Sequence, residues 1–325
     1  MRVLVTGGAG YVGSVSVERL VAAGHEVTVL DTLITGHRWG VTDGATLVEV
    51  SVGDGDLVGR TVRDRGIEAV LHCAARSLVG QSMTDPGLYY RENVVGGIAL
   101  LDTLRKTGVD RIVFSSTAAV YGDPERVPIR ESDAMRPVNP YGASKLSFEG
   151  AMRWYGVYGL RSVALRYFNV AGASERFGER HDPETHLIPN LLRAAAGGAP
   201  VTLYGEDYPT PDGTPIRDYI HVGDLADAHI LALEWTGSAA PGAHEACNLG
   251  SNSGFSVREV LAGAEAVVGR PIDHAFGPRR AGDPPSLVAA TDRARAVLGW
   301  APRRGSLEEM IGSAWRWLRD NAEIR

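Results

Sequence analysis

A glycine-rich turn near the amino terminus constrains the fold of this chain more than any other feature. The run GGAGYVG, residues 7–13, follows an apolar β-branched stretch at 2–6 and precedes an amphipathic stretch at 15–23. Glycines at this spacing permit a tight turn, close approach of the backbone to a pyrophosphate, and close packing of the helix on the strand. The free N–H groups at the helix N-terminus attract that anion. The pattern predicts a parallel α/β sheet that binds a dinucleotide.

An acidic residue ends the second predicted strand, residues 26–31. Asp31 follows Gly13 at the distance of about 20 residues that is typical of dinucleotide sites. A carboxylate there accepts hydrogen bonds from the adenosine ribose and repels a 2′-phosphate. The sequence therefore favours NAD over NADP as the cofactor.

Apolar runs and amphipathic stretches alternate through the first half of the chain. The predicted strands are residues 2–6, 26–31, 46–50, 69–73, 111–115 and 162–167, and the predicted helices include 15–23, 88–106 and 141–155. This alternation predicts a doubly wound parallel sheet of the Rossmann type over residues 1–175. Residues 176–325 are expected to form a smaller C-terminal α/β lobe that binds the substrate. Segments near 216–235 and 246–250, with strands at 216–221 and 246–249, are expected to return to the sheet domain.

Composition excludes several classes of protein. The chain has 325 residues, of which 44% are apolar and 22% charged, as in ordinary globular proteins. A net charge of −6 argues against nucleic acid as a partner. No apolar run reaches the ~18 residues of a membrane span, and the early glycines do not suit a signal peptide. Two cysteines, Cys73 and Cys247, build no disulfide framework, so we expect a cytoplasmic protein.

A tyrosine and a lysine stand four residues apart at the start of a predicted helix. Asn139 and Pro140 are typical N-cap and first-turn residues, and Tyr141 and Lys145 then share one helix face. Lys145 is one of only two lysines among the 33 basic residues, which points to a chemical role. Its ammonium, the helix N-terminus and a nicotinamide cation are expected to favour the Tyr141 phenolate, which acts as a base.

A hydroxyl group at the end of a strand completes the predicted catalytic set. Thr117 follows the strand at 111–115, where the carboxyl edge of the sheet is expected. Its hydroxyl can hydrogen-bond the reacting oxygen and help to relay the proton.

With these residues in place, the chain resembles the extended short-chain dehydrogenase/reductase superfamily, and within it the nucleotide-sugar 4-epimerases. The resemblance runs over essentially the whole chain and is carried by residues 5–13, 115–122, 139–146, 165–172, 178–189, 204–225 and 278–283. It implies interconversion of UDP-galactose and UDP-glucose. Tyr141 would take the sugar 4-hydroxyl proton while the C4 hydride passes to tightly held NAD and returns to the other face of the rotated 4-keto sugar.

The motifs and the resemblance together give two sets of binding residues. The predicted cofactor set is Gly7, Gly10, Tyr11, Val12, Gly13, Asp31, Val52, Ala74, Ala75, Asn93, Ser115, Tyr141, Lys145 and Phe168. The predicted sugar-nucleotide set is Thr117, Asn169, Leu187, Tyr204, Arg217, Tyr219, Arg280, Asp283 and Leu287. The two arginines suit a diphosphate because guanidinium groups bind paired phosphate oxygens.

The sequence departs from the family pattern at three places. Ser51 stands where an acidic residue near the adenine is common, and Arg76 and Ser77 follow Ala75 where some members have a lysine. Leu287 stands where members vary between a large aromatic and a small residue. Its intermediate size leaves N-acetylated sugars open.

Histidines along the chain do not predict a metal site. His181 and His186 are separated by a segment containing Pro183, which makes a shared helix face improbable, and no third ligand is evident. His72 and Cys73 end an apolar strand and are expected in the core.

Three other functions stay open at this point. The chain could be a 4-epimerase of another nucleotide sugar, such as a UDP-N-acetylhexosamine or a thymidine-linked hexose. A 4,6-dehydratase or decarboxylase needs an additional acid or base, and Ala118 and Ala119 after Thr117 cannot transfer protons. A non-enzymatic NAD-sensing protein would have no reason to keep Tyr141, Lys145 and Thr117 together.

The family resemblance also implies a homodimer that pairs residues 88–106 and 141–155 of two copies. Packing within the chain explains the apolar and aromatic side chains of the second helix nearly as well as this pairing, which they motivate: Leu146, Phe148, Trp154 and Tyr155.

Overall fold

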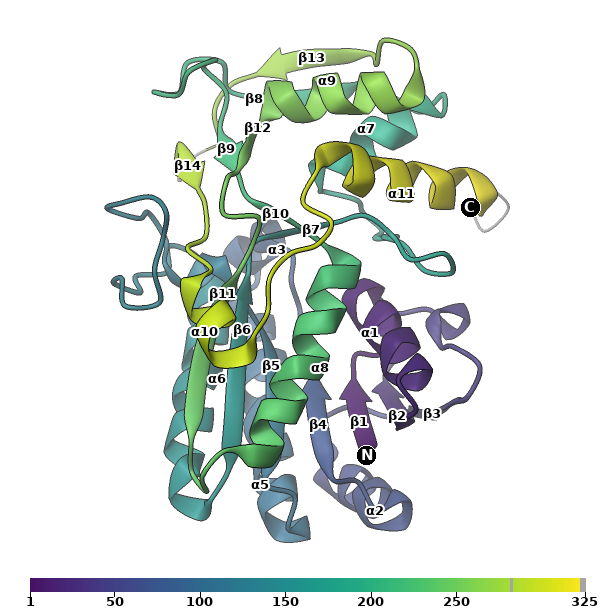
Figure 1. Cartoon of the computed structure of the whole chain (residues 1–325), viewed down its shortest axis with the longest axis vertical. Coiled ribbons are helices and arrows are strands. Elements are labelled where there is room, and N and C mark those ends of the chain that lie inside the picture. Colours follow the sequence, from purple (N-terminus) through teal and green to yellow (C-terminus); the bar gives the residue numbers. More distant parts are fainter. Residues whose placement is uncertain (281–282, 322–325) are drawn as a thin grey trace.

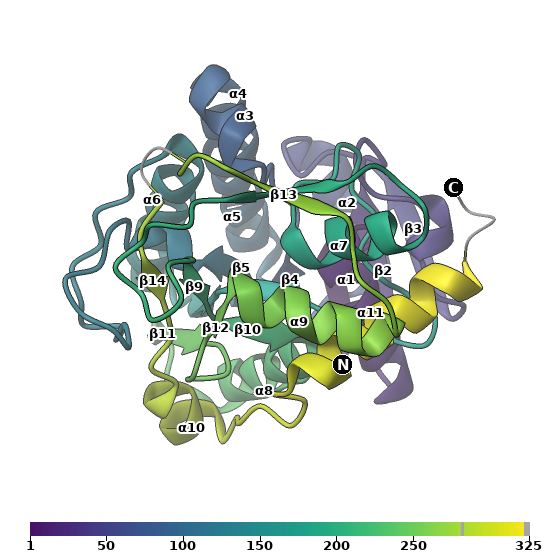
Figure 2. The ribbon, with the colours of Figure 1, turned by 90° about the horizontal axis from the view of Figure 1, so that it is seen from above.

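The structure is a computed structural model that describes residues 1–280 and 283–321. A sheet domain forms its lower part in Figure 1, and a smaller lobe lies above the carboxyl ends of the strands. Seen from above, helices of the upper lobe lie across this edge of the sheet (Figure 2). Among the described residues, no helix is long and apolar enough to cross a membrane.

Within the described residues, seven parallel strands form the main sheet, in the order β11-β6-β5-β4-β1-β2-β3. Their bounds are β1 Arg2–Thr6, β2 Glu26–Asp31, β3 Ala45–Glu49, β4 Ala69–His72, β5 Arg111–Thr117, β6 Arg161–Tyr167 and β11 His244–Leu249. The chain moves outward from β1 to β3 and then crosses to β4 on the other side of β1. Ligands of such sheets bind at this reversal, outside the carboxyl ends of the strands.

Helices cover both faces of the sheet, which explains why its strands are almost uniformly apolar. Their bounds are α1 Tyr11–Ala22, α2 Gly55–Arg65, α5 Gly96–Thr107, α6 Pro140–Tyr155, α8 Val222–Ser238 and α10 Asp292–Leu298. Along β1, Val3 and Val5 pack toward α1 and α8, whereas Leu4 packs toward α2, α5 and α6. The doubly wound parallel fold predicted from the sequence is confirmed.

The upper lobe packs three helices on short strands. Its helices are α7 Leu187–Ala195, α9 Val257–Val268 and α11 Leu307–Asp320. Its strands are β8 Val201–Tyr204 paired with β13 His274–Gly277, and β9 Ile216–Arg217 placed between β12 Phe255–Ser256 and β14 Ser286–Leu287. A separate core with Leu191, Leu203 and Ile311 holds the lobe together.

Of the segments expected to return to the sheet domain, some pack on or pair with the main sheet and one does not. β11 pairs with β6, and α8 covers the sheet. The strands within residues 216–221 do not pair with the main sheet, and the return of this segment to the sheet domain stays a prediction. β9 stays in the upper lobe, and β10 Tyr219–His221 pairs with β7 Asn169–Ala171 instead, because this stretch carries the chain between the two parts. The domain boundary at residue 175 stays a prediction.

The helix predicted at residues 88–106 is present and contains a π-helical turn. Two short helices, α3 Val79–Thr84 and α4 Pro86–Tyr89, lead into a wide π-helical turn at Tyr90–Val95, and α5 begins only at Gly96. Asn93 lies in this turn, where its amide donates to the Arg76 carbonyl and to the Ser144 hydroxyl, both at 3.0 Å. Such turns place a side chain where a regular helix would turn it away.

The residues that motivated pairing of α6 with a second copy have different environments. Phe148 is fully buried in the sheet domain, Leu146 packs beside the segment after β5, and the Tyr155 hydroxyl donates to Asp102 at 2.7 Å. Trp154 is 76% exposed. Three of the four side chains therefore make contacts within the chain, and the pairing of this helix with a second copy stays a prediction.

Candidate active site

The N-terminus of α6 places Tyr141 and Lys145 at the carboxyl edge of the sheet. Asn139 caps this helix by accepting from the Gly142 amide at 2.8 Å, and Pro140 starts the first turn. A β-carbon at position 142 would lie 2.4 Å from the Ala119 carbonyl oxygen, so only glycine lets the helix approach the end of β5 this closely. Thr117, at the end of β5, is thereby brought to the Tyr141 hydroxyl.

Hydrogen bonds fix two of the three predicted catalytic side chains. The Lys145 ammonium donates to the Ser115 carbonyl at 2.8 Å and is only 3% exposed. The Thr117 hydroxyl oxygen accepts from the Ala119 amide at 3.1 Å, and this side chain lies close enough to Tyr141 to lower that residue's pKa. Tyr141, Lys145 and Thr117 line one cavity.

Burial governs the acid–base properties of this group. It lowers the pKa of Lys145 to about 8 and raises the pKa of Tyr141 to about 12, although the Thr117 hydrogen bond works in the opposite direction on the tyrosine. Burial therefore outweighs what the protein's own groups contribute toward a phenolate, and the expected effect of the nicotinamide cation stays a prediction. The Lys145 nitrogen lies 5.9 Å from the centre of the Tyr141 ring, and loss of hydration outweighs its attraction for a phenolate.

The glycine loop before α1 fits the pyrophosphate of a dinucleotide. Gly7 has a φ of +70°, and a β-carbon there would lie 2.6 Å from the Ala74 nitrogen. A β-carbon on Gly13 would lie 2.0 Å from the Gly7 carbonyl oxygen. The N-cap Gly10 has no capping side chain, which leaves the first-turn N–H groups of α1 directed at the space in front of the loop.

Asp31 stands beside this loop as predicted. Its carboxylate accepts from the Ala9 amide at 3.0 Å and from the Leu33 amide at 2.9 Å. These two bonds fix the carboxylate and leave lone pairs for ribose hydroxyls. The chemistry of the loop and of Asp31 thus suits NAD.

One cavity of about 1030 Å³ joins the glycine loop, the catalytic group and the upper lobe. Its walls include most of the residues predicted to bind ligands: Gly7, Gly10, Tyr11, Val12, Gly13, Asp31, Val52, Ala74, Ala75, Thr117, Tyr141, Lys145, Phe168, Asn169, Leu187, Tyr204, Arg217, Tyr219, Arg280, Asp283 and Leu287. The sites that depart from the family pattern, Ser51 and Arg76, also line it. Their individual contacts with ligands stay predictions.

Two predicted cofactor residues lie behind the cavity wall. Asn93 accepts from the Arg76 amide at 2.8 Å and donates to the Arg76 carbonyl, so it clamps the loop after β4. Ser115 holds Lys145 through its carbonyl, while its hydroxyl donates to the Cys73 sulfur at 3.2 Å. We expect both to act through the residues they hold.

The upper lobe supplies two arginines to the cavity, in different states. Arg217 is paired with Asp283 at 2.5 Å and also donates to the Pro284 carbonyl at 2.9 Å. Arg280 lies with its guanidinium carbon 4.2 Å from the centre of the Tyr204 ring. Stacking on the ring orients this guanidinium and leaves its N–H groups for an anion.

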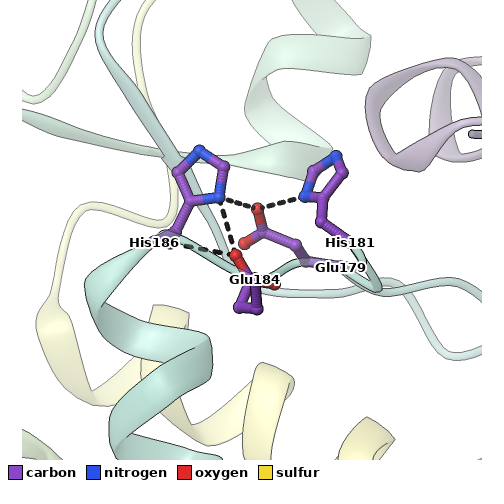
Figure 3. Close-up of side chains that lie close together, drawn as sticks. All are labelled: Glu179, His181, Glu184 and His186. Atoms are coloured by element: carbon purple, nitrogen blue, oxygen red, sulfur yellow. Dashed lines mark hydrogen bonds and ion pairs between the residues drawn. The ribbon is translucent and has the colours of Figure 1, made fainter. Parts of the chain in front are cut away.

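Four residues of the loop before α7 form an ionic cluster at the cavity. Glu179 lies between two imidazoles (Figure 3): its carboxylate is 3.0 Å from the Nδ1 atom of His181 and 2.8 Å from that of His186. The same His186 atom is 2.9 Å from Glu184. Burial lowers the pKa of His186, but the attraction of Glu179 and Glu184 outweighs burial and raises it to about 10.

The prediction that His181 and His186 have no third candidate ligand is wrong. The loop folds so that Glu179 and Glu184 join them, with one donor atom from each residue within 4.8 Å of the others. The N···O distances of 2.8–3.0 Å are those of hydrogen bonds and are shorter than the ~3.3 Å between ligands of a tetrahedral ion. These distances indicate hydrogen-bonded contacts between the imidazoles and the carboxylates, not a metal site.

Sequence reasoning missed two further residues near the catalytic group. Tyr167 lines the cavity, and burial raises its pKa well above the ordinary value. The buried His229 bridges the hydroxyls of Ser16 and Ser115, each at 3.1 Å, and burial lowers its pKa to about 3. Tyr167 could have been predicted as a site residue because it ends a parallel strand, at the edge where ligands bind. No motif near His229 in the sequence indicates its position.

His72, expected in the core, is buried and stacks on Phe114. Cys73 is half-buried: it packs against the core of the sheet domain and also lines the cavity. It follows the last residue of β4, where the chain leaves the sheet.

The doubly wound sheet, the glycine loop and the Tyr–Lys–Thr group define a dinucleotide-dependent enzyme of the extended short-chain dehydrogenase type. The model of the NAD dependent epimerase/dehydratase family matches residues 3–250. This chain belongs to that family.

Known proteins of this family are similar over the full length. UDP-glucose 4-epimerase of Lacticaseibacillus casei is 48% identical, with 99% of this chain and 98% of that protein covered. The crystal structure of UDP-glucose 4-epimerase from Brucella ovis in complex with NAD is 45% identical, with a TM-score of 0.94 and 97% of each chain covered. The enzyme from Bifidobacterium longum in complex with NAD+ and UDP is 34% identical, with a TM-score of 0.93 and 99% of each chain covered.

Proposed function

We propose that this protein is an NAD-dependent isomerase that interconverts UDP-galactose and UDP-glucose by inverting the sugar at C4. The observation that carries the proposal is that Tyr141, Lys145 and Thr117 share one cavity with the glycine loop and with Arg217 and Arg280 of the upper lobe. Relatives named UDP-glucose 4-epimerase at 45–48% identity support it.

The glycine loop and Asp31 would hold NAD, which supplies a hydride acceptor and a positive charge next to the catalytic group. Tyr141 acts as the base that takes the 4-hydroxyl proton and later returns it. Lys145, whose Nζ already donates to the Ser115 carbonyl, has two N–H groups left for ribose hydroxyls and adds positive charge. In the protein alone, burial raises the pKa of Tyr141 to about 12. The two positive charges offset this cost of forming a buried phenolate.

Thr117 positions the reacting oxygen. Its hydroxyl oxygen accepts from the Ala119 amide, so its single proton is available to Tyr141 or to the sugar 4-oxygen. Since Ala118 and Ala119 follow it, the cavity wall offers no additional acid or base there. This favours inversion at C4 over elimination of water.

The upper lobe would bind the nucleotide. Arg280 and Arg217 supply positive charge for the two phosphates, and Tyr204, Leu187, Asn169 and Tyr219 form walls around the nucleoside and the sugar. Holding the ligand by its diphosphate leaves the 4-keto sugar free to turn and present its opposite face to the cofactor. Leu287 borders the sugar end, and its size makes a UDP-N-acetylhexosamine the second substrate to test.

We also propose a homodimer in the cytoplasm. Exposed apolar side chains lie on the π-helical turn, on α5, on α6 and on the turn after α6: Val95, Ile98, Trp154 and Val157. Because α6 packs against both the π-helical turn and α5, we infer that these side chains form one apolar patch of the kind that binds protein. The free cysteines Cys73 and Cys247 suit a reducing compartment. Light scattering tests the dimer, and a particle of one chain's mass contradicts it.

The decisive experiment is incubation of the purified protein with UDP-galactose without added NAD, followed by separation of the sugar nucleotides. We expect UDP-glucose to appear and to be absent with Tyr141→Phe. No conversion of this substrate together with bound NAD would contradict the proposed substrate and direct the assay to UDP-N-acetylgalactosamine and thymidine-linked sugars. No conversion and no NAD would contradict the proposed enzyme.

A further inference from the structure

Three aromatic rings stack on the outside of the segment that follows β2. Trp39 lies between His37 and Trp317: its ring centre is 5.0 Å from that of His37 at an interplanar angle of 12°, and 6.2 Å from that of Trp317 at 30°. His37 and Trp39 belong to the sheet domain, whereas Trp317 lies on α11 in the upper lobe. The stack thus joins two parts of the chain that are about 280 residues apart in sequence.

The inner side of the same segment borders the cofactor end of the cavity. Thr32 and Gly36 line this cavity next to Asp31. The His37 amide donates to the Ala9 carbonyl at 2.9 Å, and a β-carbon on Gly36 would lie 3.0 Å from Ala9. Residues 32–40 are therefore pressed against the glycine loop where the adenosine ribose is expected.

The outer side of the stack is anchored to the upper lobe. The Trp317 indole donates to the Arg176 carbonyl at 3.1 Å, and a β-carbon on Gly178 would lie 2.4 Å from the indole. The His37 Nε2 atom bonds the Arg180 carbonyl at 3.3 Å. The Trp317 indole packs directly on the backbone of Gly178, which fixes it to the upper lobe. Movement of residues 32–40 away from the glycine loop would separate Trp39 from this indole and break the stack.

We propose that His37, Trp39 and Trp317 form a latch that holds residues 32–40 over the adenosine end of NAD and slows release of the cofactor. The inference rests on the proposed function. A 4-epimerase must keep the same cofactor molecule from the removal of hydride to its return, since loss in between leaves a keto sugar.

Exchange of bound NAD tests the latch without any sugar present. The purified protein with its bound NAD is mixed with excess isotopically labelled NAD, and the loss of unlabelled cofactor is followed over time. We expect Trp39→Leu to release NAD about tenfold faster than the wild type, because it removes one stacked pair on each face. Trp39→Phe keeps an aromatic face and is expected to restore most of the slow release.

Trp315→Leu is the matched control, because Trp315 lies on the same helix but packs into the core of the upper lobe. It should exchange NAD at the wild-type rate. His37→Ala, which leaves Trp39 on Trp317, should give a smaller acceleration and serves if Trp39→Leu does not fold. Thermal unfolding of each variant separates general destabilisation from faster release.

Two results would overturn the inference and are distinguishable. If the wild type holds NAD and both Trp39→Leu and His37→Ala exchange it at the rate of Trp315→Leu, the latch is wrong and the proposed function stands. If the wild type neither contains nor binds NAD, the proposed function and the latch are both wrong.

Discussion

The two ends of the cavity are built in different ways. At the sheet edge, the functional groups follow the ends of β1, β2, β4 and β5 or start α6, so each is fixed by a rigid element within a few residues. In the upper lobe, the groups come from loops far apart in sequence, such as Glu179, Arg217 and Arg280. This difference suggests that the sheet edge fixes the chemistry, whereas the upper lobe determines which nucleotide sugar is held.

The electrostatics of the two ends differ as well. At the sheet edge, burial raises the pKa of Tyr141 to about 12 and lowers that of Lys145 to about 8, so the protein alone disfavours the phenolate and weakens the hold on the lysine charge. In the upper lobe, Arg217 pairs with Asp283, and His186 is charged between two glutamates. The catalytic group at the sheet edge thus needs a charged ligand to become active. The charged side chains of the upper lobe are already arranged to bind a charged ligand.

The largest expected effect is at the sheet edge. Tyr141→Phe removes the only group proposed to take the 4-hydroxyl proton, so kcat should fall by about 10³-fold. Conversion of UDP-galactose measures it, and NAD extracted from the variant should equal that of the wild type. Tyr158→Phe, at an exposed tyrosine, is the control and should stay fully active. Activity of Tyr141→Phe above a tenth of wild type would contradict the assignment.

The next largest effect is expected on stability, at a buried ion pair between β6 and α6. Arg166 and Glu149 form an ion pair at 2.6 Å with side chains 5% and 4% exposed. Arg166→Met should lower the free energy of unfolding by about 3–5 kcal/mol, because it leaves a buried carboxylate unpaired. Denaturant unfolding measures the change, with exposed Arg153→Met as control. Replacing Glu149 by leucine as well should recover part of the loss, and no recovery would contradict the charge explanation.

An effect on binding alone is expected in the upper lobe. Arg280→Gln should raise the KM for the nucleotide sugar by about tenfold with kcat nearly unchanged, since the diphosphate is held equally in ground and transition states. Arg279→Gln is the matched control, because Arg279 is paired with Asp207 on the surface. A fall in kcat at constant KM would mean that the upper lobe takes part in the chemistry.

The sheet domain was largely predictable because its signals are local. Strand periodicity, the glycine run and the Asn–Pro start of α6 each act within about ten residues, and together they place Asp31, Thr117, Tyr141 and Lys145 at one edge. One local detail was missed. The helix expected at 88–106 forms, but it contains a π-helical turn that brings Asn93 to the loop after β4.

The upper lobe was predicted less well because its site depends on tertiary contacts. Pro183 correctly argues against a helix shared by His181 and His186, yet the loop brings both to Glu179. The path of residues 216–221 depends on partners more than 30 residues away. Burial, which sets the pKa of Tyr141, is likewise a property of the folded chain and left no signal in the spacing of residues.

The smallest expected effect is a pH dependence of stability from the ionic cluster. The pKa of His186 rises from 6.5 to about 10 on folding, so its contribution is fully present below pH 6.5 and is lost as the pH rises through 10. Because 43% of this side chain is exposed, screening by solvent should limit the difference to less than about 1 kcal/mol. We expect wild type and His186→Asn to differ most in melting temperature near pH 6 and to converge by pH 10. A difference that grows with pH would mean that His186 is neutral in the folded chain and that the upper lobe lacks this charge.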